Sequence, residues 1–196
     1  VARFIDAIPE IDVFSIAVTA GDVNQKVRAL HEAEVVFNNL TKNFAHDLEG
    51  VKNTQRFIDM AAIIQGGYDK LRERPIVAMG ACPNSPLEIN ENETSIIILS
   101  ARHGLPIDIL SMGLCGATTP ATLAGTLVCT NAEILGGIVL AQIVNPGNKI
   151  LYGSSTTIMD MKTAQSPVGA PEHAMCSAAV GQLGHYYGIP TNVGGT

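Results

Sequence analysis

Tryptophan is absent from this sequence of 196 residues, and basic side chains are few. The 12 Lys and Arg residues are outnumbered by 18 Asp and Glu, and they are scattered rather than gathered into a stripe. Because nucleic-acid recognition needs a basic surface, we predict that nucleic acid is not a partner. The sequence has only five Phe and four Tyr, so few aromatic side chains are available to line a binding pocket.

Cysteine motifs and membrane signals are also missing. The four cysteines, Cys82, Cys115, Cys129 and Cys176, form no CxxC pair or Cys/His cluster of the kind that holds zinc, so we expect reduced, buried thiols and no metal bound directly by this chain. The first residues lack the order of a signal peptide, and we expect no apolar run of the roughly 18 residues that span a membrane. These features predict a soluble, cytoplasmic protein.

Short β-branched runs alternate with longer segments that have a helical repeat, the pattern of parallel βα units. With 46% hydrophobic residues and no linker, the chain is expected to form one domain over residues 1–196. Six strands are predicted, at residues 11–18, 43–47, 76–81, 107–112, 150–153 and 191–194. A closed barrel needs eight strands, and the TAGD after the first strand is not a nucleotide-binding glycine loop. We therefore predict an α/β fold that is an incomplete TIM (β/α)8-type barrel of about six parallel strands.

Helices are predicted between these strands. The first covers residues 24–40 with Asp22 as its cap, the next two cover 51–65 and 68–73, and a fourth covers 92–103 and ends at Gly104. The last, residues 171–187, begins with a proline and is expected to turn Met175, Ala178, Ala179 and Leu183 inward.

Residues 120–144 are almost uncharged and rich in Gly and Ala, which lets backbones approach closely. We expect Thr118 or Thr119 to cap the helix that they form. Its one charge, Glu133, needs a partner if it is buried, and a structural hydrogen-bonding role is favoured over a catalytic one.

Active sites of parallel barrels lie on the loops that follow the strands, so polar residues there are candidates for substrate binding. Asp22 follows the first strand, where capping is the alternative role. His46 and Asp47 close the second, where helix capping is an equal alternative for Asp47. Ser85 lies in the CPNSP loop after the third, and Thr119 lies in the GLCGATTP loop after the fourth. In that fourth loop, helix capping explains the threonines but not the glycines.

The fifth and sixth strands contribute further candidates. Ser154 and Ser155 belong to the SSTT run, the richest hydroxyl cluster in the chain, which Asp160 follows. Tyr152, next to that run, is the aromatic side chain best placed to line a binding pocket. Glu172 lies in the first turn of the last helix, and Gly194 and Gly195 close the last strand.

Two long segments carry a family resemblance. YGSSTTIMDMKTAQSPVGAPEHAMCSAAVGQLGHYYGIPTNVGG at residues 152–195 and TTPATLAGTLVCTNAEILGGIVLAQIVNPG at 118–147 resemble the trimethylamine methyltransferase family, which includes glycine betaine methyltransferases. Members of that family are longer on both sides, so this chain looks like a central piece. The resemblance implies transfer of a methyl group from a methylated amine to the cobalt of a corrinoid (cobalamin) carried on a separate corrinoid protein.

Archaeal trimethylamine enzymes of this family contain a genetically encoded pyrrolysine close to the position of Gly195 or Thr196, and this sequence contains none. The resemblance therefore favours members that act on quaternary amines such as glycine betaine. Attack on a quaternary N-methyl group expels a neutral amine, so positioning and desolvation can carry the reaction.

Two other hypotheses stay open. A different barrel enzyme, such as an aldolase or lyase, is possible because fold alone does not fix chemistry, although Lys42 and Lys149 precede their strands and so lie at the wrong end for a Schiff base. Alternatively, the chain is a catalytically inactive barrel piece that self-associates through its open sheet edges, and we expect a homo-oligomer.

Overall fold

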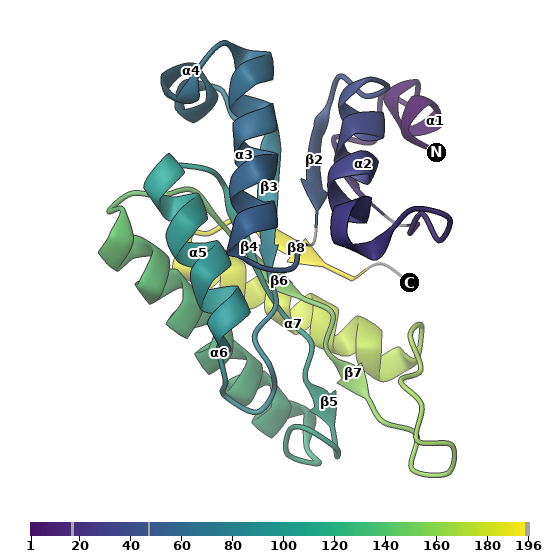
Figure 1. The fold of residues 1–196 in the computed structure, drawn as a ribbon. Coiled ribbons are helices and arrows are strands. Elements are labelled where there is room, and N and C mark those ends of the chain that lie inside the picture. Colours follow the sequence, from purple (N-terminus) through teal and green to yellow (C-terminus); the bar gives the residue numbers. More distant parts are fainter. Residues whose placement is uncertain (17, 47, 195–196) are drawn as a thin grey trace.

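Six parallel strands form one curled sheet in the computed structural model, which describes residues 1–16, 18–46 and 48–194 (Figure 1). The strands lie in the order in which they occur along the chain, and every neighbouring pair is parallel. They are β1 (Val13–Ser15), β2 (Asn43–His46), β3 (Val77–Ala81), β4 (Ile107–Ser111), β6 (Ile150–Ser154) and β8 (Thr191–Val193). The predicted incomplete barrel is therefore confirmed: the sheet is a half barrel, and all of its carboxyl ends meet at one rim.

Helices connect these strands as the alternation predicts, and they pack against the sheet (Figure 1). A short helix, α1 (Ala2–Asp6), precedes β1 and was not predicted. The others are α2 (Gln25–Phe37), α3 (Val51–Gln65), α4 (Tyr68–Glu73), α5 (Glu91–His103), α6 (Leu123–Val144) and α7 (Pro171–Tyr187).

Two additional strands, β5 (Leu114–Cys115) and β7 (Thr157–Ile158), pair with each other in parallel beyond the rim. Each follows the carboxyl end of a long strand, β5 after β4 and β7 after β6, so the two loops continue the pairing of the strands before them. In Figure 1 they lie below the main sheet, where the loop after β7 projects away from the molecule. This second sheet was not predicted, because strands of two residues are too short to show an alternation of apolar and polar side chains.

Three predictions about helices are wrong in detail. Asn24, not Asp22, caps α2, and its side chain accepts a hydrogen bond from the Lys26 backbone N–H. Thr122, not Thr118 or Thr119, caps α6 through a bond from the Gly125 N–H. In both cases the capping residue lies immediately before the first helical residue, where its side-chain oxygen can reach the unpaired N–H groups of the first turn.

The third error concerns the buried face of α7. The buried residues of α7 are His173, Cys176, Val180 and Gly184, whereas Met175 is 60% exposed. Of the four residues predicted to point inward, Leu183 does pack against the core, where it is partly buried. Spacings of three and four residues occur among both the buried residues and the predicted ones, so both sets fit one face of a helix. Because small and apolar residues occur on all sides of α7, the sequence pattern does not show which face is buried. The error matters because it brings His173 into the interior.

The helix α6 packs closely on β4 and also contacts α5 and α7. At Gly137 a Cβ atom would lie 2.8 Å from the Ile109 side chain, which confirms the expected close approach of backbones. By length and composition alone, α6 is apolar enough to cross a membrane, with a mean hydropathy of 1.8, so the expectation that no run would reach that length is wrong. Its interior side nevertheless carries the buried carboxyl group of Glu133.

Only two of the four cysteines are buried, although burial was expected of all of them. Cys115 and Cys176 lie in the interior, while Cys82 and Cys129 are half-buried. Burial raises the pKa of the Cys176 thiol, and the nearby Cys115 and Glu172 raise it further. Within the described ranges no three His, Cys, Asp or Glu side chains group in a way that could hold a metal ion.

The contact between α7 and β8 gives a stability test with a built-in control. An alanine Cβ at position 184 would lie 2.0 Å from Thr191 Cγ2, whereas nothing lies within 4 Å of one at position 181 of the same helix. We expect Gly184→Ala to lower the free energy of unfolding by about 1–3 kcal/mol through overpacking. Gly181→Ala should instead raise it by about 0.5–1 kcal/mol, because alanine favours helix. Urea unfolding compares the two, and equal stabilities would contradict the packing described here.

Candidate active site at the carboxyl ends of the strands

The central strands end together. Ser111 at the end of β4 is the register partner of Ser154 at the end of β6, and Ser154 is in turn the partner of Val193 in β8. Beyond the strands, the Ser155 N–H donates to the Ser111 carbonyl at 3.0 Å, and the Gly194 N–H donates to the Ser154 carbonyl at 3.0 Å. Hydroxyl groups and backbone polar groups are therefore gathered at one rim.

A buried carboxyl group from α6 holds this rim in place. Glu133 is 3% exposed, and its oxygens accept hydrogen bonds from Ser111 Oγ at 2.6 Å, Ser85 Oγ at 2.9 Å and the Leu87 N–H at 2.9 Å. A carboxylate only accepts hydrogen bonds, and its two oxygens have enough lone pairs to accept from all three donors. Glu133 thus joins α6 to the end of β4 and to the loop after β3, the structural role that the sequence favoured.

The donors around Glu133 give a direct stability prediction. Glu133→Ala leaves three donors without their acceptor, one of them the buried Ser111 hydroxyl, so we expect the free energy of unfolding to fall by about 2–4 kcal/mol. Glu34→Ala, which truncates an exposed glutamate of α2, is the control and should change it by less than about 0.5 kcal/mol. Chemical denaturation measures both, and a loss at Glu133 no larger than at Glu34 would show that the three bonds do not hold the rim.

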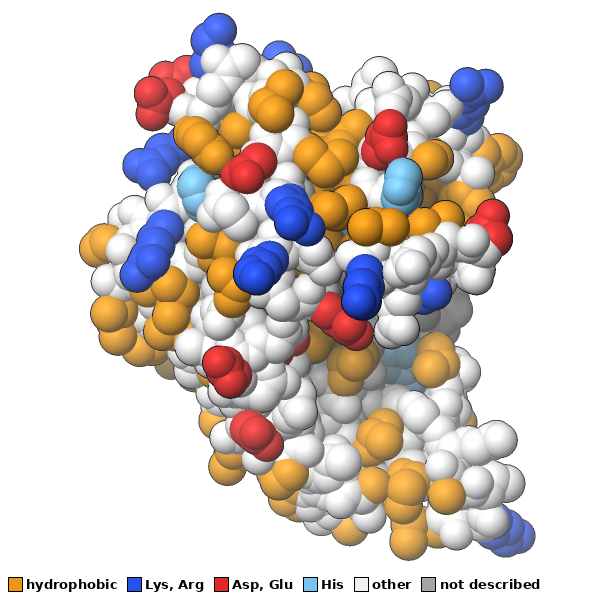
Figure 2. Space-filling model, viewed as in Figure 1, with side chains coloured by type: hydrophobic (Ala, Val, Ile, Leu, Met, Phe, Trp, Pro, Cys, Tyr) orange, Lys and Arg blue, Asp and Glu red, His pale blue; other side chains and the backbone are white. Residues whose placement is uncertain are grey.

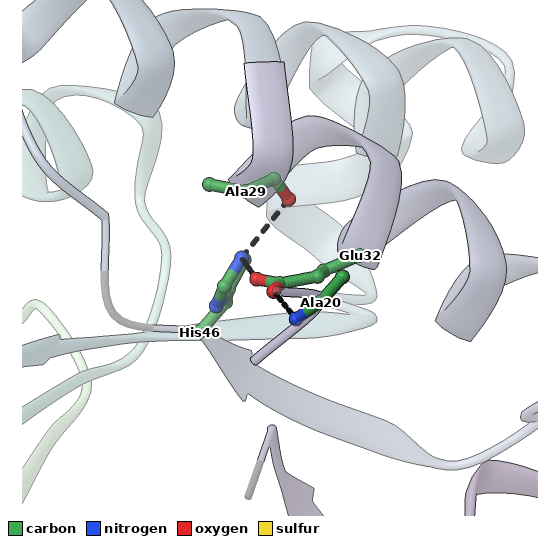
Figure 3. A network of polar contacts seen from close by, with 4 residues as sticks. All are labelled: Ala20, Ala29, Glu32 and His46. Atoms are coloured by element: carbon green, nitrogen blue, oxygen red, sulfur yellow. Dashed lines mark hydrogen bonds and ion pairs between the residues drawn. The ribbon is translucent and has the colours of Figure 1, made fainter. Parts of the chain in front are cut away.

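His46 lies at the rim end of β2, but its side chain turns toward α2 (Figure 3). Its Nε2 donates to the Ala29 carbonyl at 3.0 Å and lies 3.7 Å from a Glu32 carboxylate oxygen, while the other Glu32 oxygen accepts from the Ala20 N–H at 2.7 Å. A cavity of about 310 Å³ borders this network and is lined by polar side chains of α2 and α3. His46 is thus part of a hydrogen-bonded network that ties the loop after β1 to α2.

His173 lies near the start of α7, and its ring lies next to Gly194, the residue that follows β8. Its side chain is 2% exposed, and its Nδ1 accepts a hydrogen bond from the Gly169 N–H at 3.3 Å. Its Nε2 is buried and has no hydrogen-bond partner. A Cβ atom at Gly194 would lie 2.7 Å from that Nε2 and 3.1 Å from Ser155 Oγ, so the glycine lets the ring approach the end of β8.

The SSTT run begins with the last residue of β6, Ser154, and ends with the first residue of β7, Thr157. Its hydroxyl groups make different contacts. Ser154 Oγ accepts from the Thr156 N–H at 3.1 Å, which turns the chain away from the strand. Ser155 is half-buried beside Gly194, and Thr156 Oγ1 is buried without a hydrogen-bond partner. Of the predicted binding residues, Ser154, Ser155 and Gly194 are therefore brought together.

Tyr152, Thr119 and Ser85, three of the predicted binding residues, are each hydrogen-bonded within the protein. Tyr152 points between the sheet and the helices, where it is fully buried and its hydroxyl donates to Asn131 of α6 at 2.6 Å. Burial raises the pKa of that hydroxyl. Thr119 is buried with its hydroxyl 2.9 Å from that of Thr126, and Ser85 is bonded to Glu133.

The glycines of the loop after β4 also have structural causes. At Gly113 a Cβ atom would lie 2.8 Å from the side chains of both Thr119 and Thr130. Gly116 has a φ of +84°, which favours glycine. Ligand approach is therefore not needed to explain either of them.

Asp22 and Glu172 belong to the segments that follow β1 and β7. Asp22 is exposed in the turn before α2, and Glu172 is half-buried in the first turn of α7. Asp47 and Gly195 lie outside the described residues. Ser111, Thr156 and His173 were missing from the predicted set; for His173 the available signal was its spacing from Cys176, Val180 and Gly184, which share one face of the helix.

Asp160 is used within its own loop. Its carboxylate accepts from the Lys162 N–H at 2.9 Å and from the Thr163 hydroxyl at 2.9 Å, and these bonds, the backbone one first, lower its pKa below the ordinary value for an aspartate. Since a lowered pKa means that the ionised form is favoured in the folded loop, the turn is stabilised at neutral pH and loses this contribution as the pH falls through the folded-state pKa.

An NMR titration tests this assignment. We expect the Asp160 carboxyl signal to titrate below the ordinary range, and the variant Thr163→Val, which removes one donor, to move its pKa back upward. An Asp160 pKa that is ordinary in both proteins would contradict the loop structure.

A curled sheet of parallel strands, with helices between them and polar groups at their carboxyl ends, is the architecture of β/α-barrel proteins whose active sites lie at that rim. The family model described as Trimethylamine methyltransferase (MTTB) matches residues 1–196. The chain belongs to the trimethylamine methyltransferase family.

Characterised relatives agree with this assignment. The chain is 47% identical over its whole length to trimethylamine methyltransferase MttB of Desulfitobacterium hafniense and 42% identical to that of Methanosarcina barkeri. A glycine betaine methyltransferase of Desulfitobacterium hafniense is 36% identical over 89% of the chain. The chain spans 39%, 40% and 36% of these three relatives, so it corresponds to well under half of each of them.

Proposed function

We propose that the intact protein to which this chain belongs transfers a methyl group from a methylated amine to the Co(I) corrinoid of a separate corrinoid protein. The observation that carries the proposal is the family match over the whole chain. The printed names of the relatives supply the substrate class, since each is a methyltransferase named for a methylated amine. We further propose that the protein acts in the cytoplasm and as a homo-oligomer.

The polar groups at the rim can serve this chemistry by holding the amine in place. When bound, the corrinoid supplies the cobalt nucleophile, so the protein needs only to hold the amine with one N-methyl group facing outward. Ser155, Thr156 and His173 offer hydrogen-bond donors beside the ends of β6 and β8, and Glu133 fixes the neighbouring end of β4. Their role in the proposal is to bind and orient the amine and to displace water from it.

Exposed apolar side chains occur in the loops beyond the rim. Met112 follows β4, and Met161 and Val168 lie in the loop after β7, each more than half exposed. In Figure 2 the projecting lobe that contains β5 and β7 carries few charged side chains, whereas the half built from α2, α3 and α4 carries many. A weakly charged, Met-containing surface at the rim suits contact with the partner that presents the corrinoid.

For the methyl donor we propose a quaternary amine such as glycine betaine. A quaternary nitrogen leaves as a neutral amine, so no proton has to be supplied, and the donors at the rim have no need to act on nitrogen. Trimethylamine is the second candidate, favoured by identities of 41–47% to relatives named for it, against 36% to the one named for glycine betaine.

An aldolase-type mechanism through a Schiff base has less support. Lys42 precedes β2, and its ammonium donates to backbone carbonyls of Ile5, Ile8 and Ile11, which ties α1 and the segment before β1 to the opposite end of the sheet. Lys149 likewise directly precedes β6. Both lysines therefore lie away from the rim where the reaction would take place.

Methyl transfer can be measured with the intact protein and free Co(I) cobalamin. We expect the spectrum of Co(I) to be replaced by that of methylcobalamin when glycine betaine is added, and more slowly or not at all with trimethylamine, choline or carnitine. Faster reaction with trimethylamine would replace the proposed donor with the second candidate. No spectral change with any of these amines, with the cognate corrinoid protein also present, would refute the proposed function.

A further inference from the structure

A buried hydrogen-bond donor with nothing to bind lies at the rim. The backbone N–H of Gly169 can only donate, so Nδ1 of His173 must accept with its lone pair. The ring proton of the neutral imidazole is then on Nε2, which is buried and unpartnered. Because an unpaired buried donor costs free energy, a side chain in this state indicates that something outside the described residues accepts from it.

The surroundings of this nitrogen are rich in donors. Ser155 Oγ and His173 Nε2 both lie close to the point where Gly194 would carry a side chain, at 3.1 Å and 2.7 Å from it. The hydroxyl of Thr156, the next residue, is also buried and unpartnered. A buried N–H donor with a hydroxyl group close by fits a ligand that brings anionic oxygen atoms, and a carboxylate is the simplest such group.

We infer that His173 is a substrate-binding residue whose Nε2–H, together with the Ser155 hydroxyl, binds a carboxylate carried by the methylated amine. The inference rests on the proposed function and deepens it, because it names the side chains that recognise the acid end of a betaine. The amine end then lies over the neighbouring strand ends, a few bonds from the carboxylate. An amine without an acid group, such as trimethylamine, leaves the Nε2–H unpaired and is bound more weakly.

Binding without turnover tests the inference in the intact protein. Isothermal titration with glycine betaine and with tetramethylammonium, which keeps the quaternary nitrogen but lacks the carboxylate, separates recognition of the two ends. We expect His173→Leu to raise the Kd of glycine betaine by about 10- to 100-fold, the loss of a charge-assisted hydrogen bond. The Kd of tetramethylammonium should stay within about twofold of that of the unchanged protein, because that ligand never used the imidazole.

Three further variants separate recognition from folding. His173→Gln, whose amide can place an N–H near the original Nε2, should recover part of the betaine affinity, and Ser155→Ala should weaken betaine by about 2- to 10-fold. His185→Leu, at an exposed histidine of the same helix, is the matched control and should bind both ligands unchanged. If His173→Leu does not fold, the inference is tested on Ser155→Ala and His173→Gln by the same comparison of ligands.

Equal losses of affinity for both ligands in the His173 variants would show that the imidazole is structural and would overturn the inference. Unchanged betaine binding in His173→Leu and Ser155→Ala would overturn it as well. Because binding is measured without cobalt, these results are independent of methyl transfer. Carboxylate-dependent binding with no methyl transfer to cobalamin would support the inference and count against the proposed function.

Discussion

The buried carboxyl group of Glu133 is the interaction on which the arrangement of the rim depends. Through three hydrogen bonds it joins the longest helix to the end of β4 and to the loop after β3. Parallel strands bring their carboxyl ends to one edge, but the loops that leave that edge need to be held if side chains are to converge. The Glu133 carboxylate can be buried in an otherwise uncharged helix because the donors around it stabilise its charge through hydrogen bonds.

From this anchor the polar groups extend across three neighbouring strands. β4, β6 and β8 end in register, and backbone bonds beyond each strand keep the serines of the SSTT run beside Gly194. His173 then approaches from α7, which is possible because position 194 has no side chain. The proposed methyl transfer would need donors that are held rigidly, since its chemical step depends on orientation more than on proton transfer.

The sequence predicts the fold well, because alternating strand and helix segments leave little choice beyond a parallel sheet with its site at the carboxyl ends. It predicts the site less well. Tyr152 was expected at the rim, but a strand that is buried on both faces shows no alternation that reveals which face a side chain takes. The state of His173 depends on Gly169 and Gly194, which are brought to it by the fold, and residue spacing does not encode their distances. Glu133 was identified correctly as structural because a lone charge in an apolar helix requires partners wherever they lie.

A crystal structure of the intact protein with glycine betaine bound would show whether the methylated amine binds over the carboxyl ends of the strands. We expect density for the ligand beside the ends of β6 and β8, with its carboxylate within hydrogen-bonding distance of His173 Nε2 and its methyl groups facing solvent. A ligand bound at the opposite end of the sheet, or between the outer faces of α6 and α7, would contradict this expectation.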